Sequence, residues 1–267
     1  MTKRTKKIIV IGMLFYLIVV TYCIFAAIKD EQGVRLSNTS AITMFYYIQF
    51  SGVDSSLTKD VLNLLIISGL SSFYIIFMKN NNQFNNIIQR VGYKKFFLKS
   101  IVNVFCTVSL LTVFVYLYEL IVINWFYFPL NFSGTILPGE FAATFSSNFG
   151  VQTIWYILSS SIGWGIFAVL IFSIGLFIKK NAIYLILSAI VGLALIMFIF
   201  LLPINSFTIF LANITIILNL IAPGQVSIHS QFPPLGLPLT WVIIAIIYAS
   251  VSFLLIKLWY KKQLRGA

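Results

Sequence analysis

Residues able to do acid–base, nucleophilic or metal chemistry are scarce in this chain and are not grouped. Its 267 residues include one His and two Cys, and Cys23 and Cys106 both lie inside apolar runs, where a thiol behaves as a small hydrophobe. His229 lies alone in a polar segment, so a zinc site with its several ligands is not expected. No phosphate-binding G-x-x-x-x-G-K-[ST] sequence occurs. We therefore expect a protein that is not an enzyme and that holds neither a metal nor a cofactor.

One acidic side chain, Glu119, lies inside an apolar segment. A charge at membrane depth is costly and marks a candidate functional residue for that reason. Glu119 is four residues before Ile123, near the end of its segment. That position favours a structural or interfacial role over contact with a substrate. Two amides in a later apolar stretch, Asn213 and Asn219, complete the candidate polar site.

The sequence from Asn82 to Gly92 has the spacing of a short amphipathic helix. Its apolar residues recur at i, i+3, i+4 and i+7 and so share one face, with polar residues opposite and Gly92 as the stop. The residues of this candidate coupling site are Phe84, Asn85, Ile87, Ile88, Arg90, Val91 and Gly92. Such a helix can dock on a cytosolic partner protein, or it can lie on lipid headgroups with its basic flanks attracted to them. The spacing does not separate these two interpretations.

Small residues four positions apart predict close contact between helices, because they let two backbones approach each other. Packing within one bundle is favoured over a subunit interface. The residues are Ser159, Ser161, Gly163 and Gly165 in one segment and Ser188 and Gly192 in the next.

Six apolar stretches are long enough to place these residues in a membrane, since a helix crosses the hydrocarbon core with about 20 apolar residues. The stretches are continuous rather than alternating, which predicts helices and not a β-barrel. The expected fold class is all-α, as one polytopic transmembrane domain over residues 1–267. The expected spans are 8–28, 61–78, 101–123, 151–178, 182–202 and 239–256.

Positive charge lies on alternate sides of these stretches. Of 18 Lys and Arg, 15 fall in four segments without any Asp or Glu: 3–7, 79–99, 179–180 and 257–265. Short basic loops stay in the cytoplasm, so both termini are expected on the cytoplasmic side. The expected location is the cell membrane, as a multi-pass protein, and specifically a bacterial plasma membrane. The bases flank apolar segments and can contact anionic membrane lipid. They do not form a basic face interleaved with aromatic side chains that could contact bases, which argues against nucleic acid as a partner.

Two further apolar stretches are not expected to cross. Ser206 to Ala222 carries polar residues and is bracketed by Pro203 and Pro223, and its crossing would put the basic C-terminal segment outside. We expect it to be an outer re-entrant or interfacial segment between the fifth and sixth spans, with a full crossing as the alternative. Ala41 to Phe50 is too short to cross and is predicted to be an interfacial element of the first outer loop.

This arrangement resembles the membrane subunit of ABC-2-type transporters. The sequence FNNIIQRVGYKKFFLKSIVN, residues 84–103, is similar to the inner loop of small ABC-2-like permeases of Gram-positive bacteria. Some of those permeases serve export of, or immunity to, bacteriocins and antimicrobial peptides. The resemblance implies a permease that pairs with a second copy or a paralogue. It also implies a separate ATPase subunit, which holds ATP and Mg and receives the coupling helix.

Three other functions compete with this one. A secondary transporter or channel subunit predicts charges inside the membrane or spans broken by Gly or Pro. A membrane-embedded hydrolase or transferase requires a converging set of acids and bases, which one His and Glu119 do not supply. A non-transporting immunity or scaffold protein is compatible with the same sequence.

Overall fold

Within the residues that it describes, the computed structural model is all-helical. It describes residues 3–34, 41–49, 54–81, 83–84, 90, 92–135, 144–201, 203, 205–225 and 235–265. Among these, β-structure is limited to one isolated antiparallel bridge between Thr135 and Asn148. The all-α prediction is therefore confirmed for this part of the chain.

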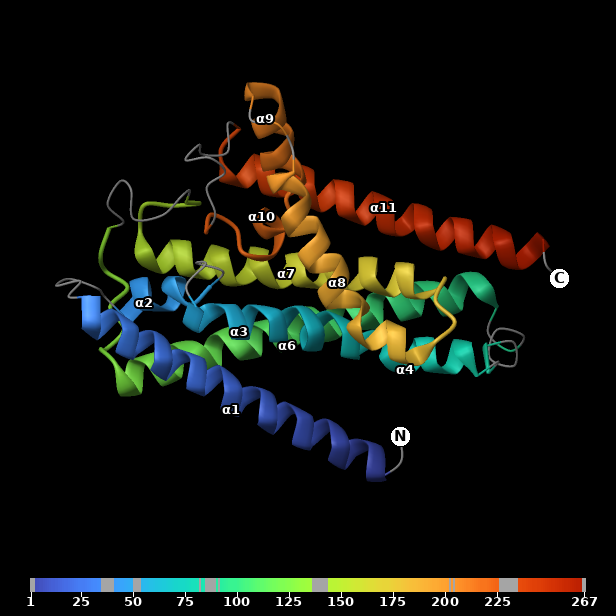
Figure 1. Cartoon of the computed structure of the whole chain (residues 1–267), viewed down its shortest axis with the longest axis horizontal. Coiled ribbons are helices and arrows are strands. Elements are labelled where there is room, and N and C mark those ends of the chain that lie inside the picture. Colours follow the sequence, from blue (N-terminus) through green and yellow to red (C-terminus); the bar gives the residue numbers. More distant parts are fainter. Residues whose placement is uncertain are drawn as a thin grey trace.

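The helices follow one another as expected for a chain of long apolar segments joined by short connections (Figure 1). In chain order they are α1 (Lys3–Val34), α2 (Ala41–Tyr47), α3 (Asp54–Leu62), the π-helical turn η1 (Asn63–Ile67), α4 (Ser68–Asn80), α6 (Tyr93–Phe126), α7 (Phe149–Gly175), α8 (Asn181–Phe200), α9 (Ser206–Thr215), α10 (Leu218–Ile221) and α11 (Leu237–Arg265).

Five of the described helices are long and apolar enough to cross a membrane, namely α1, α6, α7, α8 and α11. The segments Thr58–Ile67 and Ser71–Asn80 meet the same test only when taken together, and they are bent by 47° at their junction. These helices make the chain a membrane-embedded protein. The count rises from five to six if the bent pair is one span.

Helix α7 is the central element of the bundle. Of its most apolar window, 72% is buried, a larger share than in any other of the five helices. It packs against α6, α11, α4, α10 and α8, and it runs through the middle of the molecule in Figure 1. The carboxamide of Asn148 begins α7 by accepting a hydrogen bond from the Val151 amide at 3.1 Å, as N-cap side chains do.

The second apolar segment differs from its predicted bounds, 61–78. Helix α3 and the turn η1 continue directly into α4, so the segment begins before Val61 and includes Lys59 and Asp60. A π-turn inserts an extra residue into the helical ladder, which accounts for a bend at this place. Hydropathy did not predict this extension, because two adjacent charged residues, Lys59 and Asp60, are typical of a loop.

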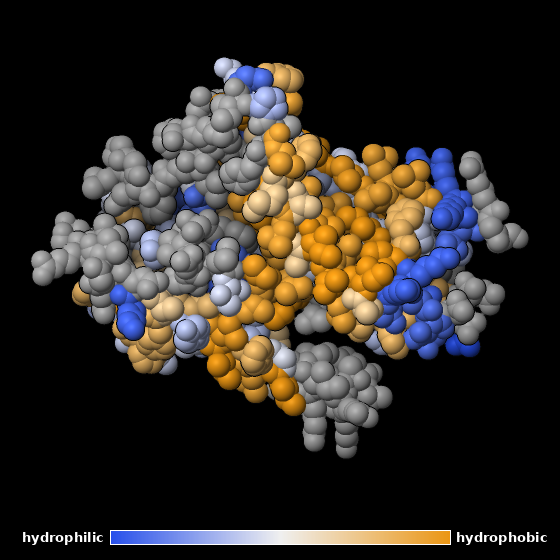
Figure 2. Space-filling view, viewed as in Figure 1, coloured by the Kyte–Doolittle hydropathy of each residue, from blue (hydrophilic) through white to orange (hydrophobic). Residues whose placement is uncertain are grey.

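The two ends of the bundle differ in charge. The ends of α4, α7 and α11 and the starts of α6 and α8 meet at one end, here called the basic end. Contacts there include Lys79 with the α7 carbonyls, Asn80 with Asn181, and the Tyr93 ring with the Tyr260 ring. Figure 2 shows a hydrophilic cap at the right of the molecule beside an apolar surface. The basic end therefore gathers bases that are far apart in the sequence.

Helix α2 was predicted to be an interfacial element, and this stays a prediction. Ala41, Ile42, Met44, Phe45 and Tyr46 are all buried inside the bundle, and α2 packs against α6. Most of its apolar side chains therefore contact protein.

Candidate functional site

The most distinctive site in the described part of the chain is a buried triad of Gln49, Lys59 and Glu119. The Lys59 Nζ donates to Glu119 Oε1 at 3.2 Å and to Gln49 Oε1 at 2.9 Å. The Gln49 Nε2 donates to Glu119 Oε2 at 2.5 Å. Lys59 and Glu119 are fully buried and Gln49 nearly so. Both carboxylate oxygens and both ends of the amide are therefore engaged, as an ion pair withdrawn from water requires.

Three separate elements bring the triad together at the end of the bundle opposite the basic end. Gln49 follows α2, Lys59 lies in α3, and Glu119 lies near the end of α6. Glu119 is recognisable in the sequence as a charge inside an apolar segment, but the sequence did not identify Lys59 or Asp60 as buried. Lys59 is fully buried as well, and Asp60 is nearly so. The missed signal was the apolar run directly after Asp60, which continues the same helix.

A shell of tyrosines surrounds the triad. The Tyr16 hydroxyl donates to Asn63 Oδ1, which ties α1 to η1. The Tyr116 hydroxyl lies 2.7 Å from Ser160 Oγ, and Ser160 in turn donates to the Ile221 carbonyl. These hydrogen bonds connect α6, α7 and α10 beside Glu119, which is one turn from Tyr116 on α6. The site is therefore a polar network inside an otherwise apolar bundle.

Tyr46 joins the same shell from α2. Its hydroxyl lies 3.3 Å from Thr153 Oγ1 on α7, and its ring meets the Tyr156 ring edge-on with 5.1 Å between centroids. Burial raises the pKa of the Tyr46 phenol, so the group stays a neutral hydrogen-bonding partner. This contact holds α2 against α7.

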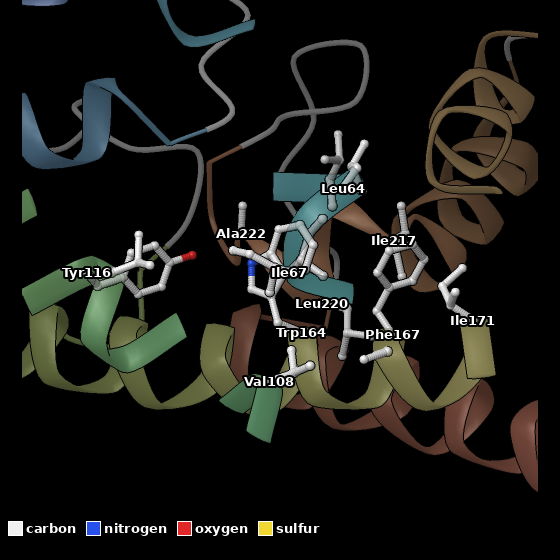
Figure 3. Packing of buried hydrophobic residues seen from close by; sticks show 14 of the residues in the cluster. Leu64, Ile67, Val108, Tyr116, Trp164, Phe167, Ile171, Ile217, Leu220 and Ala222 are labelled. Carbon is white, nitrogen blue, oxygen red and sulfur yellow. The ribbon is translucent and has the colours of Figure 1, made fainter. Parts of the chain in front are cut away.

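The segment that contains Asn213 and Asn219 enters the bundle. Helix α9 ends at Thr215, the chain breaks its helical path at Ile216, and α10 resumes at Leu218. Figure 3 shows Leu220, Ala222 and Ile217 of this segment beside Trp164 and Phe167 of α7. Both Asn side chains are fully buried.

The break leaves helical carbonyls without their usual partners, and neighbouring side chains supply them. Trp241 Nε1 donates to the Leu220 carbonyl at 3.2 Å, and the Tyr248 hydroxyl donates to the Thr215 carbonyl at 2.7 Å. Asn219 Nδ2 donates to the Asn213 carbonyl at 3.0 Å. Irregular backbone at membrane depth is stable when protein groups satisfy it in this way.

The predicted coupling helix lies only partly in the described part of the chain. Asn85, Ile87, Ile88 and Val91 are outside the described residues. Arg90 is exposed, and Gly92 has a φ of 79°, a conformation that favours glycine just before α6.

The structure places Phe84 inside the chain's own fold. Its ring lies 4.9 Å from the Phe96 ring and 6.2 Å from the Trp259 ring, between centroids, and its side chain is buried. Phe84 therefore contacts α6 and α11 of its own chain. The docking of the loop on a partner stays a prediction.

Of the small residues predicted at helix contacts, the three glycines lie against other helices of the same chain. A side chain at Gly163 would collide with the Leu220 carbonyl of α10, and one at Gly165 would collide with Ser109 and Phe105 of α6. At Gly192 a Cβ would come within 2.6 Å of Leu64. Ser188 Oγ lies 3.4 Å from the Leu65 carbonyl, whereas Ser159 and Ser161 bond within α7.

Among the described residues, no group of three or more His, Cys, Asp or Glu is placed to hold a metal ion. Comparison of the chain with protein families, curated proteins and solved structures returns no match. The function must therefore be argued from the geometry of the buried triad, the broken α9–α10 segment and the inner loop.

Proposed function

We propose that this chain is the membrane subunit of an ABC-2-like transporter of the bacterial plasma membrane. It moves an amphiphilic peptide or a lipid-linked molecule across the membrane, and a separate ATPase subunit supplies the energy. It works with a second copy or a paralogue, and two ATPase subunits bind at the basic end, in the cytoplasm. The chain has six spans, α3–η1–α4 being one of them, and both termini are inside.

The observation that carries this proposal is the α9–α10 segment. It lies between the last two long apolar helices, it is broken at Ile216, and it packs against α7 and α11. Helix α9 has 10 residues and so covers about 15 Å, half of the roughly 30 Å core of a bilayer. We infer that the segment re-enters from the outer side, which is the arrangement that the resemblance to ABC-2 permeases implies.

The positions of the triad and the inner loop support a mechanism. The loop joins α4 to α6 at the basic end, and Glu119 of α6 pairs at the opposite end with Lys59, which belongs to the same bent unit as α4. A push on the loop by the ATPase moves α4 and α6 relative to each other. That motion acts on both partners of the ion pair. The pair therefore holds the outer end of the bundle closed, and it separates during transport.

The experiment is purification of the chain from its native membranes, followed by ATP turnover and transport in lipid vesicles. A P-loop ATPase is expected to co-purify, and Ile88→Ala is expected to uncouple its ATP hydrolysis from transport. Lys94→Gln with Lys95→Gln is the control, because a protein groove responds to side-chain shape and a lipid surface to charge. The proposal fails if the wild-type chain never binds an ATPase, or if only the Lys variants have an effect.

The buried ion pair and the bent second span also favour one rival, a secondary transporter. Such a protein would move its substrate along an ion or proton gradient without ATP. Vesicles that hold the purified chain alone separate the two functions. Substrate accumulation driven by a gradient in the absence of any ATPase would favour the rival.

A further inference from the structure

A cavity of about 510 Å³ opens at the basic end of the bundle. Five elements or connections line it: the end of α4, the inner loop at Phe84, the start of α6, the stretch after α7, and the end of α11. Its polar lining includes Lys79, Lys179, Lys262 and Gln263, and its aromatic lining includes Tyr93 and Trp259.

The lysines of this cavity do different things. Lys79 Nζ donates to the carbonyls of Gly175, Leu176 and Ile178 at 3.0, 2.9 and 2.5 Å, which uses all three of its N–H groups at the end of α7. Lys179 and Lys262 are exposed at the cavity, and neither makes an ion pair or hydrogen bond with the described part of the chain. Two ammonium groups are therefore available to a ligand.

No acidic residue balances these charges. None lines the cavity, and the sequence contains no Asp or Glu from residue 61 to 118 or after Glu140. Every segment that meets at the basic end therefore contributes bases without acids. The cavity is therefore positively charged and favours an anionic ligand.

The level of the cavity indicates where that anion comes from. Trp259 and Tyr93 lie where the apolar surface of α11 gives way to Lys261 and Lys262, and such aromatic residues mark the headgroup zone of a membrane. One to two turns away, an apolar hollow of about 350 Å³ lies between α6 and α11 with α7 beside both. Phe105, Val169 and Phe253 are among its lining residues.

The two spaces follow the same face of α11. Ser252 and Ile256 line the apolar hollow, and Trp259 and Gln263 line the basic cavity. Positions 252, 256, 259 and 263 are spaced by four, three and four residues, so they form one stripe along the helix. A ligand with an anionic head and an apolar tail matches both spaces, whereas a free anion matches only one.

We propose that the basic cavity binds the phosphate of an anionic phospholipid from the inner leaflet, with an acyl chain in the apolar hollow. Basic pockets between membrane helices on the cytoplasmic side bind such headgroups through the same chemistry. The site rests on the orientation given under the proposed function but not on the ATPase. Bound lipid holds α11 to the ends of α4 and α7, next to the inner loop.

The test compares lipid binding to the purified full-length chain, without any ATPase, by native mass spectrometry in detergent. Phosphatidylglycerol is expected to stay bound where phosphatidylcholine does not. The variant Lys179→Gln with Lys262→Gln is expected to weaken phosphatidylglycerol binding about twentyfold, from roughly fivefold per lysine near a membrane surface. The control, Lys180→Gln with Lys261→Gln, removes the same charge from exposed neighbours that do not line the cavity, and it is expected to bind as the wild type does.

Two outcomes would overturn the proposal. Equal weakening in both double variants would mean that diffuse surface charge, and not a site, attracts the lipid. Stabilisation of the chain against heat by inorganic phosphate, equal to that by phosphatidylglycerol, would mean that the cavity takes a free anion. Because neither readout involves ATP, failure of this proposal is separate from failure of the transporter proposal.

Discussion

Lys59 and Glu119 are an ion pair that the fold withdraws completely from water. The free energy of desolvating two charges is offset only when their geometry is good and their remaining hydrogen-bonding groups are satisfied. Gln49 meets that condition by bridging both partners. An apolar pair of similar volume would stabilise the bundle as well or better, so stability alone does not explain why the charges are here. Under the proposed function the pair separates during transport, and that requirement would account for the charges.

The first prediction separates these roles. Glu119→Leu and Lys59→Met each leave one charge buried and unpaired, and each is expected to lower the free energy of unfolding by roughly 3–5 kcal/mol. The double variant removes both charges, so its loss is expected to be much smaller than the sum. Denaturant unfolding in micelles measures the stability, and transport in vesicles measures function. We expect the double variant to fold and not to transport, whereas a stable and active double variant would make the pair purely structural.

The second prediction concerns Gly163. A methyl group there would collide with the backbone carbonyl of Leu220, which cannot move aside as a flexible side chain does. Gly163→Ala is therefore expected to displace α10 and to lower stability by about 1–3 kcal/mol, the usual range for overpacking.

Gly12→Ala is the matched control for Gly163→Ala. It is also a helical glycine, but a Cβ there meets nothing within 4 Å. It is expected to raise stability by roughly 0.5–1 kcal/mol, because alanine favours the helix. Thermal unfolding of the two variants, side by side, measures the difference, and equal behaviour would contradict the packing of α10 on α7.

The candidate site was only half predictable at this scale. Glu119 lies inside an apolar run, so it could be identified from the sequence. Lys59 and Asp60 lie at the edge of an apolar run, where they cannot be distinguished from loop residues. Their burial depends on a helix that starts before the apolar run, and on partners 10 and 60 residues away from Lys59. Sequence spacing carries no information about contacts of that range.

The short elements α2 and α10 pack inside the bundle, whereas α9 buries only Ile209, Ala212 and Asn213. The sequence predicted that α9–α10 would not cross, because a crossing would put the basic C-terminal segment outside and because the stretch carries polar residues between two prolines. It did not predict that α2 packs against α6, since Phe45 and Tyr46 suit an interface and a protein interior equally well. The long helices were predictable because about 20 apolar residues in a row allow little else.

The third prediction tests how α9–α10 is held. Asn219→Leu keeps the number and branching of the side-chain heavy atoms but removes the donor to the Asn213 carbonyl, a buried group. The expected loss of stability is about 1–3 kcal/mol, the free energy of leaving such a group unsatisfied. Asn103→Leu on the exposed face of α6 is the control and is expected to be neutral or stabilising in micelles. If both Asn variants are equally stable, the amide of Asn219 does not hold the segment.

The fourth prediction concerns the inner loop as an element. Phe84 packs on Phe96 and Trp259, so Phe84→Ala is expected to loosen the loop and lower stability by about 3–5 kcal/mol, as large-to-small changes at buried aromatic residues do. Arg90→Ala, at an exposed position, is expected to leave stability within about 0.5 kcal/mol. Hydrogen exchange of the 82–92 segment is the measurement. Faster exchange in the Phe84 variant than in the wild type is expected, and equal exchange in the two would show that other contacts hold the loop.

At the scale of the whole molecule, the two ends of the helical bundle differ in charge. The ten described Lys and Arg of the segments 79–99, 179–180 and 257–262 belong to elements that meet at the basic end, whereas Asp60 and Glu119 lie toward the other. The preference for positive charge on the cytoplasmic side predicts from this polarity that the basic end lies in the cytoplasm. The path of the α9–α10 segment tests this orientation, because a crossing of the membrane by that segment would place the end of α11 outside.

The fifth prediction follows from that geometry. In a chain with Cys23 and Cys106 replaced by Ala, single cysteines at Ser147, Asn205, Asn81 and Gln263 all occupy exposed positions. An impermeant thiol reagent added outside intact cells is expected to label Ser147→Cys and Asn205→Cys. Labelling of Asn81→Cys and Gln263→Cys is expected only after the cells are opened. Labelling of Gln263→Cys from outside, with Asn81→Cys still protected, would require α9–α10 to cross, although its 10-residue and 4-residue helices, parted at Ile216, together fall short of the bilayer core. That result would reverse the direction of α11 in the membrane. The end of α11 would then lie on the opposite side from the other residues that line the basic cavity. Neither the ATPase nor an inner-leaflet lipid could then bind at the basic end as proposed.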